Sequence, residues 1–149
     1  MKTEPDVFSW DHLIKAKDQT TPWEGVRNYQ ARNLMRDEMK LGDQVLFYHS
    51  SCEVPGAVGI AEVVKESHPD LTALNPKSDY FDEKSAKKGE SQWAMVAVKA
   101  VKKFKEPVTL TAMRSIKGLE DMVLLRRGSR LSVQPVTKAE WDIIVKLSK

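Results

Sequence analysis

Residues 23–52 carry aromatic rings interleaved with planar hydrogen-bonding groups, a mixture that core packing alone does not require. The rings belong to Trp23, Tyr29, Phe47 and Tyr48. The polar groups among them are the side chains of Arg27, Asn28, Gln30, His49, Ser50 and Ser51. A pocket for a flat, polar ligand such as a nucleobase needs both apolar walls and directed hydrogen bonds. We therefore expect Trp23 and Tyr48 to converge as the two walls of one slot.

The energetics of base recognition indicate which residues would read the ligand. A base inside a duplex shows only its groove edges, so close inspection requires a single-stranded or extruded nucleotide, and extrusion costs roughly a few kcal/mol. Stacking on an aromatic side chain returns about 1–3 kcal/mol per base. Burying an added methyl contributes only about 0.8 kcal/mol, whereas an unpaired polar group costs about 1–3 kcal/mol. We therefore expect the walls to sense a substituent and base identity to be set by Asn28, His49, Ser50 and Gln134.

Most of these candidates also have an ordinary structural explanation. Asn28 could simply cap a helix, and Tyr29 at the start of that helix could cover the core. Trp23 lies outside any periodic apolar stripe, which favours a pocket wall. Trp93 could be wall or core, and Gln134 could face a ligand or water.

Positive charge is concentrated in the second half of the chain. Residues 1–83 carry 9 Lys and Arg against 15 Asp and Glu, while residues 84–149 carry 15 against 6, within a net charge of +3. Such a distribution suits contact with a phosphate backbone, although solvated lysines that keep the protein soluble would give the same pattern. The expected backbone contacts are Lys2, Lys99, Lys102, Lys103, Arg126, Arg127 and Arg130.

Catalysis and protein binding are the alternative functions. His49 and Cys52 could form a base and nucleophile pair, but residues three apart at a strand end face opposite sides unless the chain turns. No nucleophile elbow, phosphate loop or dinucleotide motif is present. His12, His49 and His68 lack metal-type spacing. We expect no enzyme activity, no cofactor and no metal; a protein-interaction module with an empty pocket remains the third possibility.

Several elements that would position these residues can be read from caps and periodicity. Ser9 would cap a short helix ending near residue 17, Asn28 a second helix, and Thr137 with Glu140 a capping box for a C-terminal helix. Alternating patterns predict strands at residues 44–49, 56–65, 93–104 and 130–136, with a turn at residues 20–22 and a short helix after residue 110. Small residues at 57, 59 and 61 indicate a strongly curved or closely approached sheet, as in a small closed barrel. Residues 67–92 are polar, and we expect a long surface excursion that is either mobile or a lid over the site.

Length and composition limit the remaining possibilities. With 149 residues and 41% apolar content, the chain can bury one core, and we expect a single domain over residues 1–149. No apolar run has the length of a signal peptide or membrane span. Cys52 is the only cysteine, which excludes an intrachain disulfide and favours a reducing compartment. We expect a soluble, monomeric protein of the cytoplasm, or of the nucleus in a eukaryote, with no membrane partner.

At this point the chain resembles a known family, the EVE domains. The matching segments are KTEP (residues 2–5), WEGVRNYQARN (23–33), GDQVLFYHSSC (42–52), VPGAVG (54–59), YFD (80–82), Trp93 and RLSVQPV (130–136). The resemblance implies an α+β, PUA-like fold, with a small β-barrel of five to six strands and flanking helices. It also implies a nucleic-acid reader, of DNA or RNA, for methylated or otherwise modified cytosine, and places Lys2 and Glu4 at the barrel mouth. The candidate ligand site therefore comprises Trp23, Val26, Arg27, Asn28, Tyr29, Tyr48, His49, Ser50, Pro55, Gly56, Trp93 and Gln134.

Overall fold

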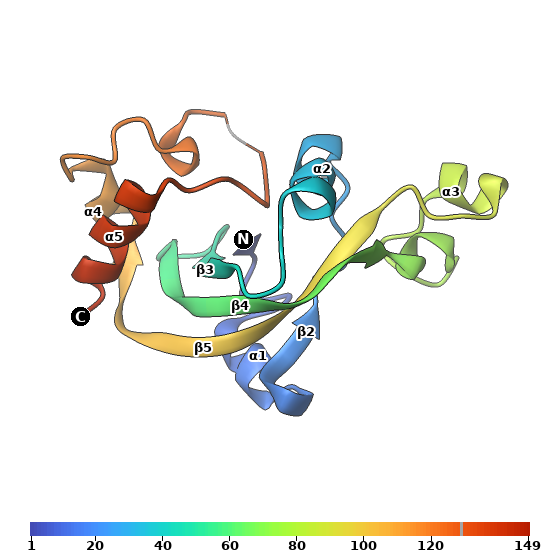
Figure 1. Cartoon of the computed structure of the whole chain (residues 1–149), viewed down its shortest axis with the longest axis horizontal. Helices are drawn as coiled ribbons and strands as arrows, with labels where there is room; N and C mark the ends of the chain where they lie inside the picture. The colour runs from blue at the N-terminus through green and yellow to red at the C-terminus, as the bar shows by residue number, and fades with distance from the viewer. Residues whose placement is uncertain (129) are drawn as a thin grey trace.

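Five strands form one mixed sheet, in the order β1-β3-β4-β5-β2 (Figure 1). The strands of this computed structural model, which describes residues 1–128 and 130–149, are β1 (Lys2–Thr3), β2 (Thr20–Pro22), β3 (Gln44–His49), β4 (Gly56–Pro69) and β5 (Ala94–Thr109). The pairing of β1 with β3 is parallel, and the other three pairings are antiparallel. The edge strands β1 and β2 do not pair with each other in the described part of the chain, so the expected barrel is an open, strongly curved sheet.

Helices surround the sheet on several sides. They are α1 (Trp10–Lys15), α2 (Tyr29–Asp37), α3 (Glu83–Lys88), α4 (Leu110–Arg114) and α5 (Lys138–Leu147), with 3-10 turns η1 (Lys17–Gln19), η2 (Leu71–Leu74) and η3 (Val123–Leu125). In Figure 1, α4 and α5 lie together at one end, and α3 lies at the far tip of β4 and β5. Within residues 1–128 and 130–149, no helix has the length and apolarity to cross a bilayer.

The predicted helix caps are confirmed. The Ser9 side chain accepts a hydrogen bond from the His12 amide, the Asn28 side chain accepts from the Ala31 amide, and Thr137 with Glu140 forms the expected capping box. These local sequence signals suffice because each cap needs only residues within one helical turn.

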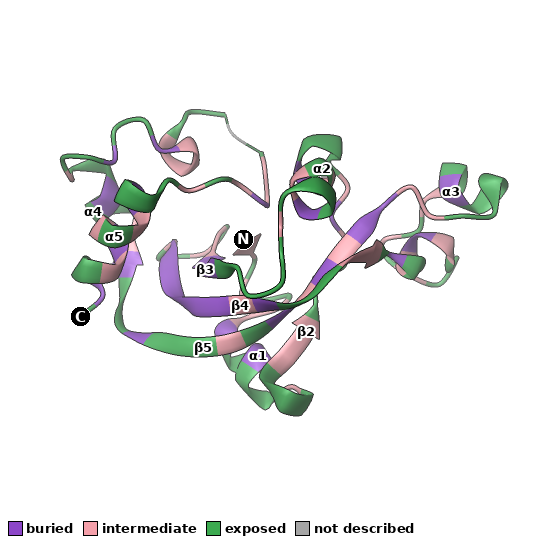
Figure 2. Ribbon diagram, viewed as in Figure 1, coloured by how far each residue is buried: buried purple, intermediate pink, exposed green. Residues whose placement is uncertain are grey.

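The sheet separates two hydrophobic cores, and buried residues follow its central strands on both faces (Figure 2). Successive side chains of β3 point to opposite faces, so Val45 and Phe47 enter the first core while Leu46 and Tyr48 enter the second. The first core also contains residues of α1 and α2, and the second contains residues of α4 and α5. Neighbouring residues of this strand therefore serve different sides of the molecule.

Two expectations about strands were wrong. Residues 20–22 are the edge strand β2 rather than a turn. Residues 130–136 form no strand, although the Ser132 carbonyl accepts a 2.7 Å hydrogen bond from the Lys2 amide. Long-range pairing decides both cases, and local periodicity carries no signal for it.

The segment that follows β4, up to residue 92, is mostly exposed or half-buried, as expected for a surface excursion. It contains η2 and α3, and its Asp70 is completely buried.

Gly59 confirms that the small residues of β4 permit a close approach. A Cβ atom at this position would lie 2.6 Å from Cζ3 of Trp10 and 2.8 Å from the Lys102 carbonyl oxygen. The ladder between β4 and β5 changes register between residues 57 and 59 and again between 60 and 61, which bends both strands. A side chain at position 59 would therefore force Trp10 and β5 apart.

We expect Gly59→Ala to lower the free energy of unfolding by about 1–3 kcal/mol, the usual cost of overpacking. Urea denaturation measures it. Gly128→Ala is the matched control, since a Cβ atom at Gly128 would meet open space among the described residues and only the φ of +77° opposes a side chain. A smaller loss at Gly59 than at Gly128 would contradict the close approach.

Candidate nucleic-acid interface

A cavity of about 380 Å³ opens where the sheet fails to close. We call it the seam cavity, because β1 and β2, the two edges of the sheet, both contribute to its wall. Its lining residues are Lys2, Thr3, Glu4, Val7, Phe8, Thr21, Pro22, Trp23, Glu24, Gly25, Val26, Arg27, Tyr80 and Ser132. Its volume lies within the range of about 300–1,000 Å³ that is common for small-ligand sites.

Trp23 borders the seam cavity from the segment that follows β2. Its amide donates to the Val96 carbonyl at 2.7 Å, which continues the pairing of β2 with β5 by one residue. The indole packs edge-on against Phe47, with 5.6 Å between ring centroids and an interplanar angle of 90°. Trp23 is thus both a core residue and a cavity wall, and the two interpretations of the sequence do not exclude each other.

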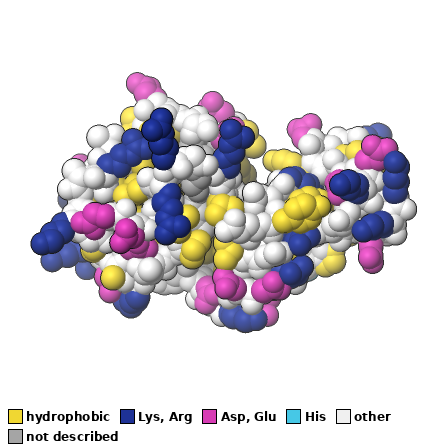
Figure 3. Space-filling model, turned by 90° about the horizontal axis from the view of Figure 1, so that it is seen from above, with side chains coloured by type: hydrophobic (Ala, Val, Ile, Leu, Met, Phe, Trp, Pro, Cys, Tyr) yellow, Lys and Arg dark blue, Asp and Glu magenta, His cyan; other side chains and the backbone are white. Residues whose placement is uncertain are grey.

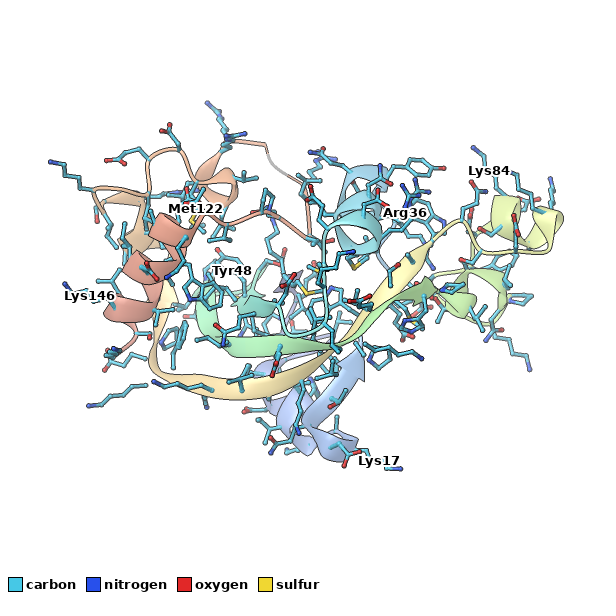
Figure 4. The ribbon with its side chains drawn as sticks, viewed as in Figure 1. Lys17, Arg36, Tyr48, Lys84, Met122 and Lys146 are labelled. Carbon is cyan, nitrogen blue, oxygen red and sulfur yellow. The ribbon has the colours of Figure 1, made fainter. Side chains whose placement is uncertain are left out.

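Tyr48 does not face Trp23, so the expected slot between these two rings is wrong. Tyr48 lies in the second core and lines a separate small cavity with Met122 and Gln134 (Figure 4). The reason is the alternation of β3, because Phe47 reaches Trp23 and its neighbour Tyr48 must point to the opposite face. Burial raises the pKa of Tyr48, and nearby Cys52 raises it further.

Arg27 lines the seam cavity, but its guanidinium donates hydrogen bonds to other groups of the protein. Nε and Nη2 donate to the Tyr80 carbonyl at 3.1 and 2.7 Å, and Nη1 donates to the Val26 carbonyl at 2.9 Å. Nη1 also donates to Asp70 Oδ2 at 3.0 Å, and Nη2 to Thr72 Oγ1 at 3.2 Å. A guanidinium has five N–H donors, and all five are used, so Arg27 holds the cavity wall rather than binding an anion.

Asp70 is the buried anchor of this network. Its carboxylate accepts from the Gly25 amide at 2.9 Å, from Arg27, and from both the amide and the hydroxyl of Thr72. Burial by itself raises the pKa of Asp70, but the hydrogen bonds from Thr72, Gly25 and Arg27 outweigh burial and hold the pKa below its ordinary value. The excursion is therefore fixed to the segment that carries Trp23.

Tyr80 completes the wall because Gly25 has no side chain. Gly25 has a φ of +85°, and a Cβ atom there would lie 2.6 Å from Cε1 and Cζ of Tyr80. The sequence had not singled out Tyr80 as a cavity residue, although it belongs to the YFD segment of the family resemblance. One residue of the excursion therefore forms part of the cavity wall.

Tyr29 and Trp93 form a stack beside the cavity, and neither lines it. Their ring centroids are 4.7 Å apart, and the Arg32 guanidinium lies 4.8 Å from the Tyr29 ring. Trp93 Nε1 donates to Asp82 Oδ2 at 2.9 Å, which ties the stack to the N-cap of α3. The stack joins α2 to the excursion.

The four polar residues expected to read a base also lie outside the seam cavity. Asn28 caps α2, His49 Nε2 accepts from the Trp10 amide at 3.1 Å, and the Ser50 amide donates to the Thr3 carbonyl at 2.9 Å. Gln134 Nε2 donates to the Leu131 carbonyl at 2.7 Å beside the second core. We had grouped Asn28, His49 and Ser50 because they lie close to Trp23 or Tyr48 in the sequence. The fold places their side chains away from the cavity that Trp23 lines.

Pro55 and Gly56 shape the start of β4. The Pro55 carbonyl accepts from the Leu110 amide at 2.9 Å, and a Cβ at Gly56 would lie 2.7 Å from the Val108 carbonyl oxygen. Both residues therefore serve the contact between β4 and β5, and neither lines the seam cavity.

The basic residues fall into two groups. Lys2 lines the seam cavity, and burial lowers the pKa of its ammonium. The others are exposed on β5 and on the segment before residue 132: Lys99, Lys102, Lys103, Arg126, Arg127 and Arg130. On the face seen in Figure 3, Lys and Arg side chains are interspersed with Asp and Glu, so this face presents mixed charge rather than one basic field.

The seam cavity also contains two carboxylates, of which the family resemblance had indicated Glu4 and nothing in the sequence had indicated Glu24. Glu4 follows β1, and Glu24 follows Trp23. Partial burial and the charge of Asp70 raise the pKa of Glu24, while Arg27 lowers it. Glu24 differs from an ordinary surface glutamate only in its position, because it lies between the edge strand β2 and the buried Asp70.

The residues of the alternative catalytic pair are not joined. Within residues 1–128 and 130–149, no hydrogen bond links His49 to Cys52, and no group of three metal-type side chains is present. Burial lowers the pKa of His49, and Asp11 opposes that shift.

These features define a domain class, and the chain belongs to the EVE domain family, whose model matches residues 1–147. It is 42% identical to thymocyte nuclear protein 1 of Gallus gallus, with all of this chain and 67% of that protein covered. A Pseudomonas putida crystal structure matches with a TM-score of 0.93 and 44% identity, covering 100% of this chain and 97% of the other. The human THYN1 protein in complex with 5-methylcytosine containing DNA matches with a TM-score of 0.91 and 39% identity, covering 100% and 95%. The resemblance drawn from the sequence is confirmed.

We expect Asp70→Asn to destabilise the protein by about 3 kcal/mol, because it breaks a buried ion pair and leaves Arg27 without its charge partner. Thermal or urea denaturation measures the loss. Asp37→Asn is the control, since Asp37 pairs with Arg36 on the surface and its removal should leave the midpoint unchanged. Equal effects of the two substitutions would contradict the anchoring role of Asp70.

The stabilisation by Asp70 should also depend on pH. Its folded-state pKa lies below the ordinary value of 3.8, so the ionised form stabilises the fold above that value, and this stabilisation is lost as pH falls through the folded pKa. We expect the stability difference between wild type and Asp70→Asn to be constant near neutral pH and to shrink below about pH 4. Urea midpoints across that range test it; a difference that grows with acidity would show the opposite linkage.

Proposed function

We propose that this chain binds DNA that carries 5-methylcytosine or a related modified cytosine, and that it holds the extruded base in the seam cavity. The observation that carries the proposal is the seam cavity beside Trp23, in a fold that matches a protein in complex with 5-methylcytosine containing DNA at a TM-score of 0.91. Binding, without a chemical step, is the whole of the proposed activity.

The lining of the cavity suits a flat heterocycle. Trp23 and Tyr80 supply aromatic surface, and Val7, Phe8 and Val26 supply aliphatic and aromatic contacts for a substituent. Stacking returns about 1–3 kcal/mol per base, which is comparable with the few kcal/mol that extrusion costs. Contacts to the flanking phosphates would supply the rest of the affinity.

Exposed cations near the cavity are the proposed phosphate contacts. Arg130 lies two residues before Ser132, which lines the cavity, and Lys2 lines it directly. Lys99, Lys102 and Lys103 follow β5, which pairs with the edge strand β2. Of these lysines, Lys99 pairs directly with β2, opposite Thr20, and is the β5 cation whose backbone lies next to that edge strand.

Catalysis has less support than binding. The Nε2 lone pair of His49 accepts the Trp10 amide, which uses the nitrogen that a general base would need. His49 and Cys52 also lie outside the seam cavity, so a base held there would not meet them.

Filling the cavity should weaken base recognition without disturbing the core. Val7 is 63% exposed and lines the cavity, so we expect Val7→Trp, and likewise Thr21→Trp, to weaken binding of a duplex with one 5-methylcytosine about tenfold, equivalent to about 1.4 kcal/mol. Fluorescence anisotropy measures the affinity.

Val54→Trp is the matched control for this experiment. Val54 is 59% exposed and does not line the cavity, so its substitution should leave the affinity unchanged. Wild-type affinity for the methylated duplex in both cavity-filling variants would remove the seam cavity from the proposal.

A further inference from the structure

Three charged side chains of the described structure border the seam cavity without a partner. Within residues 1–128 and 130–149, the side chains of Lys2, Glu4 and Glu24 make no hydrogen bond and no ion pair to the protein. Asp70, close enough to Glu24 to raise its pKa, accepts four hydrogen bonds instead. The same stretch of structure thus holds one carboxylate that is fully satisfied and another whose acceptor capacity is unused.

A carboxylate that has no hydrogen-bond partner in the protein, in a cavity with aromatic walls, can accept a hydrogen bond from an amino group on a flat ring. Cytosine carries a 4-amino donor, and carboxylates are the side chains that accept from it. Thymine and uracil carry a carbonyl oxygen at the same position, so a carboxylate that faces position 4 meets a second acceptor instead of a donor. The cavity chemistry therefore separates bases by the group at ring position 4, independently of a methyl at position 5.

Of the two carboxylates, Glu24 is better placed to read that group. Trp23 and Glu24 both line the seam cavity, so a ring held against the indole would share that cavity with the Glu24 carboxylate. Although Glu24 is exposed as a residue, desolvation and the charge of Asp70 raise the pKa of its carboxyl group. An N–H donor from a ligand would oppose that shift, whereas Glu4 has no such neighbour in the described network.

We propose that Glu24 is a specificity-determining residue of the seam cavity, which accepts a hydrogen bond from the 4-amino group of the bound base and so selects cytosines over thymine and uracil. This inference rests on the proposed function, because it assigns a role at the same site. Lys2, on the opposite edge strand β1, supplies a donor for the ring acceptors of the same base.

A pair of ligands isolates the hydrogen-bonding edge of the base from its 5-methyl group. 5-Methylcytosine and thymine both carry the 5-methyl group, so duplexes containing either base opposite an abasic site differ in the amino or carbonyl group at position 4 and in ring nitrogen 3, which accepts in cytosine and donates in thymine. We expect wild type to prefer 5-methylcytosine, and Glu24→Gln to reduce the ratio of the two affinities about tenfold, because a glutamine amide can accept from an amino group or donate to a carbonyl. Glu24 is exposed, so the substitution should leave the fold intact, which circular dichroism checks.

Glu4→Gln is the matched control, since it removes the other carboxylate of the cavity. A wild-type affinity ratio in Glu24→Gln would overturn the assignment while leaving the proposed function in place, and so would a ratio that falls in Glu4→Gln instead. If wild type binds neither base more tightly than a duplex in which the target position is itself abasic, the proposed function fails, and the role of Glu24 fails with it.

Discussion

The ion pair between Arg27 and Asp70 is the constraint on which the seam cavity depends. It joins two segments that lie 43 residues apart, and the Gly25 amide and the Tyr80 carbonyl complete the same network. Desolvating two charges is expensive, so the pair persists only because every donor of the guanidinium and both oxygens of the carboxylate are satisfied. As a consequence, the aromatic wall contributed by Tyr80 is held rigidly against the wall contributed by the segment after β2.

The curvature of the sheet explains why a cavity is present at all. Gly56 and Gly59 let β4 approach β5 and Trp10 closely, and the register changes along this ladder bend both strands. The two edge strands come close enough to share a cavity wall, yet within the described residues they do not pair. A fully closed barrel would replace this opening with backbone hydrogen bonds, whereas the open seam leaves room for a ligand between the edges.

The charged residues near Trp23 fall into two groups. One group makes hydrogen bonds or ring contacts within the protein, and the other does not. Arg27, Arg32 and Asp70 are engaged by backbone carbonyls, amides or aromatic rings. Glu24 and Lys2 line the same region, and their side chains make no hydrogen bond to the described residues of the protein. The sequence had indicated Arg27 and Asn28 as ligand contacts, whereas the structure engages both of them within the protein.

The sequence by itself determined the features that depend on neighbours within one helical turn or one strand. These are the caps at Ser9, Asn28 and Thr137, the strand at residues 44–49, the small residues of β4, and, through its motifs, the family. Only the tertiary structure decided that Trp23 and Tyr48 belong to different faces, that β2 is an edge strand, and that Asp70 meets Arg27. The physical reason is that facing and pairing depend on contacts between segments tens of residues apart, for which composition and periodicity carry no local signal.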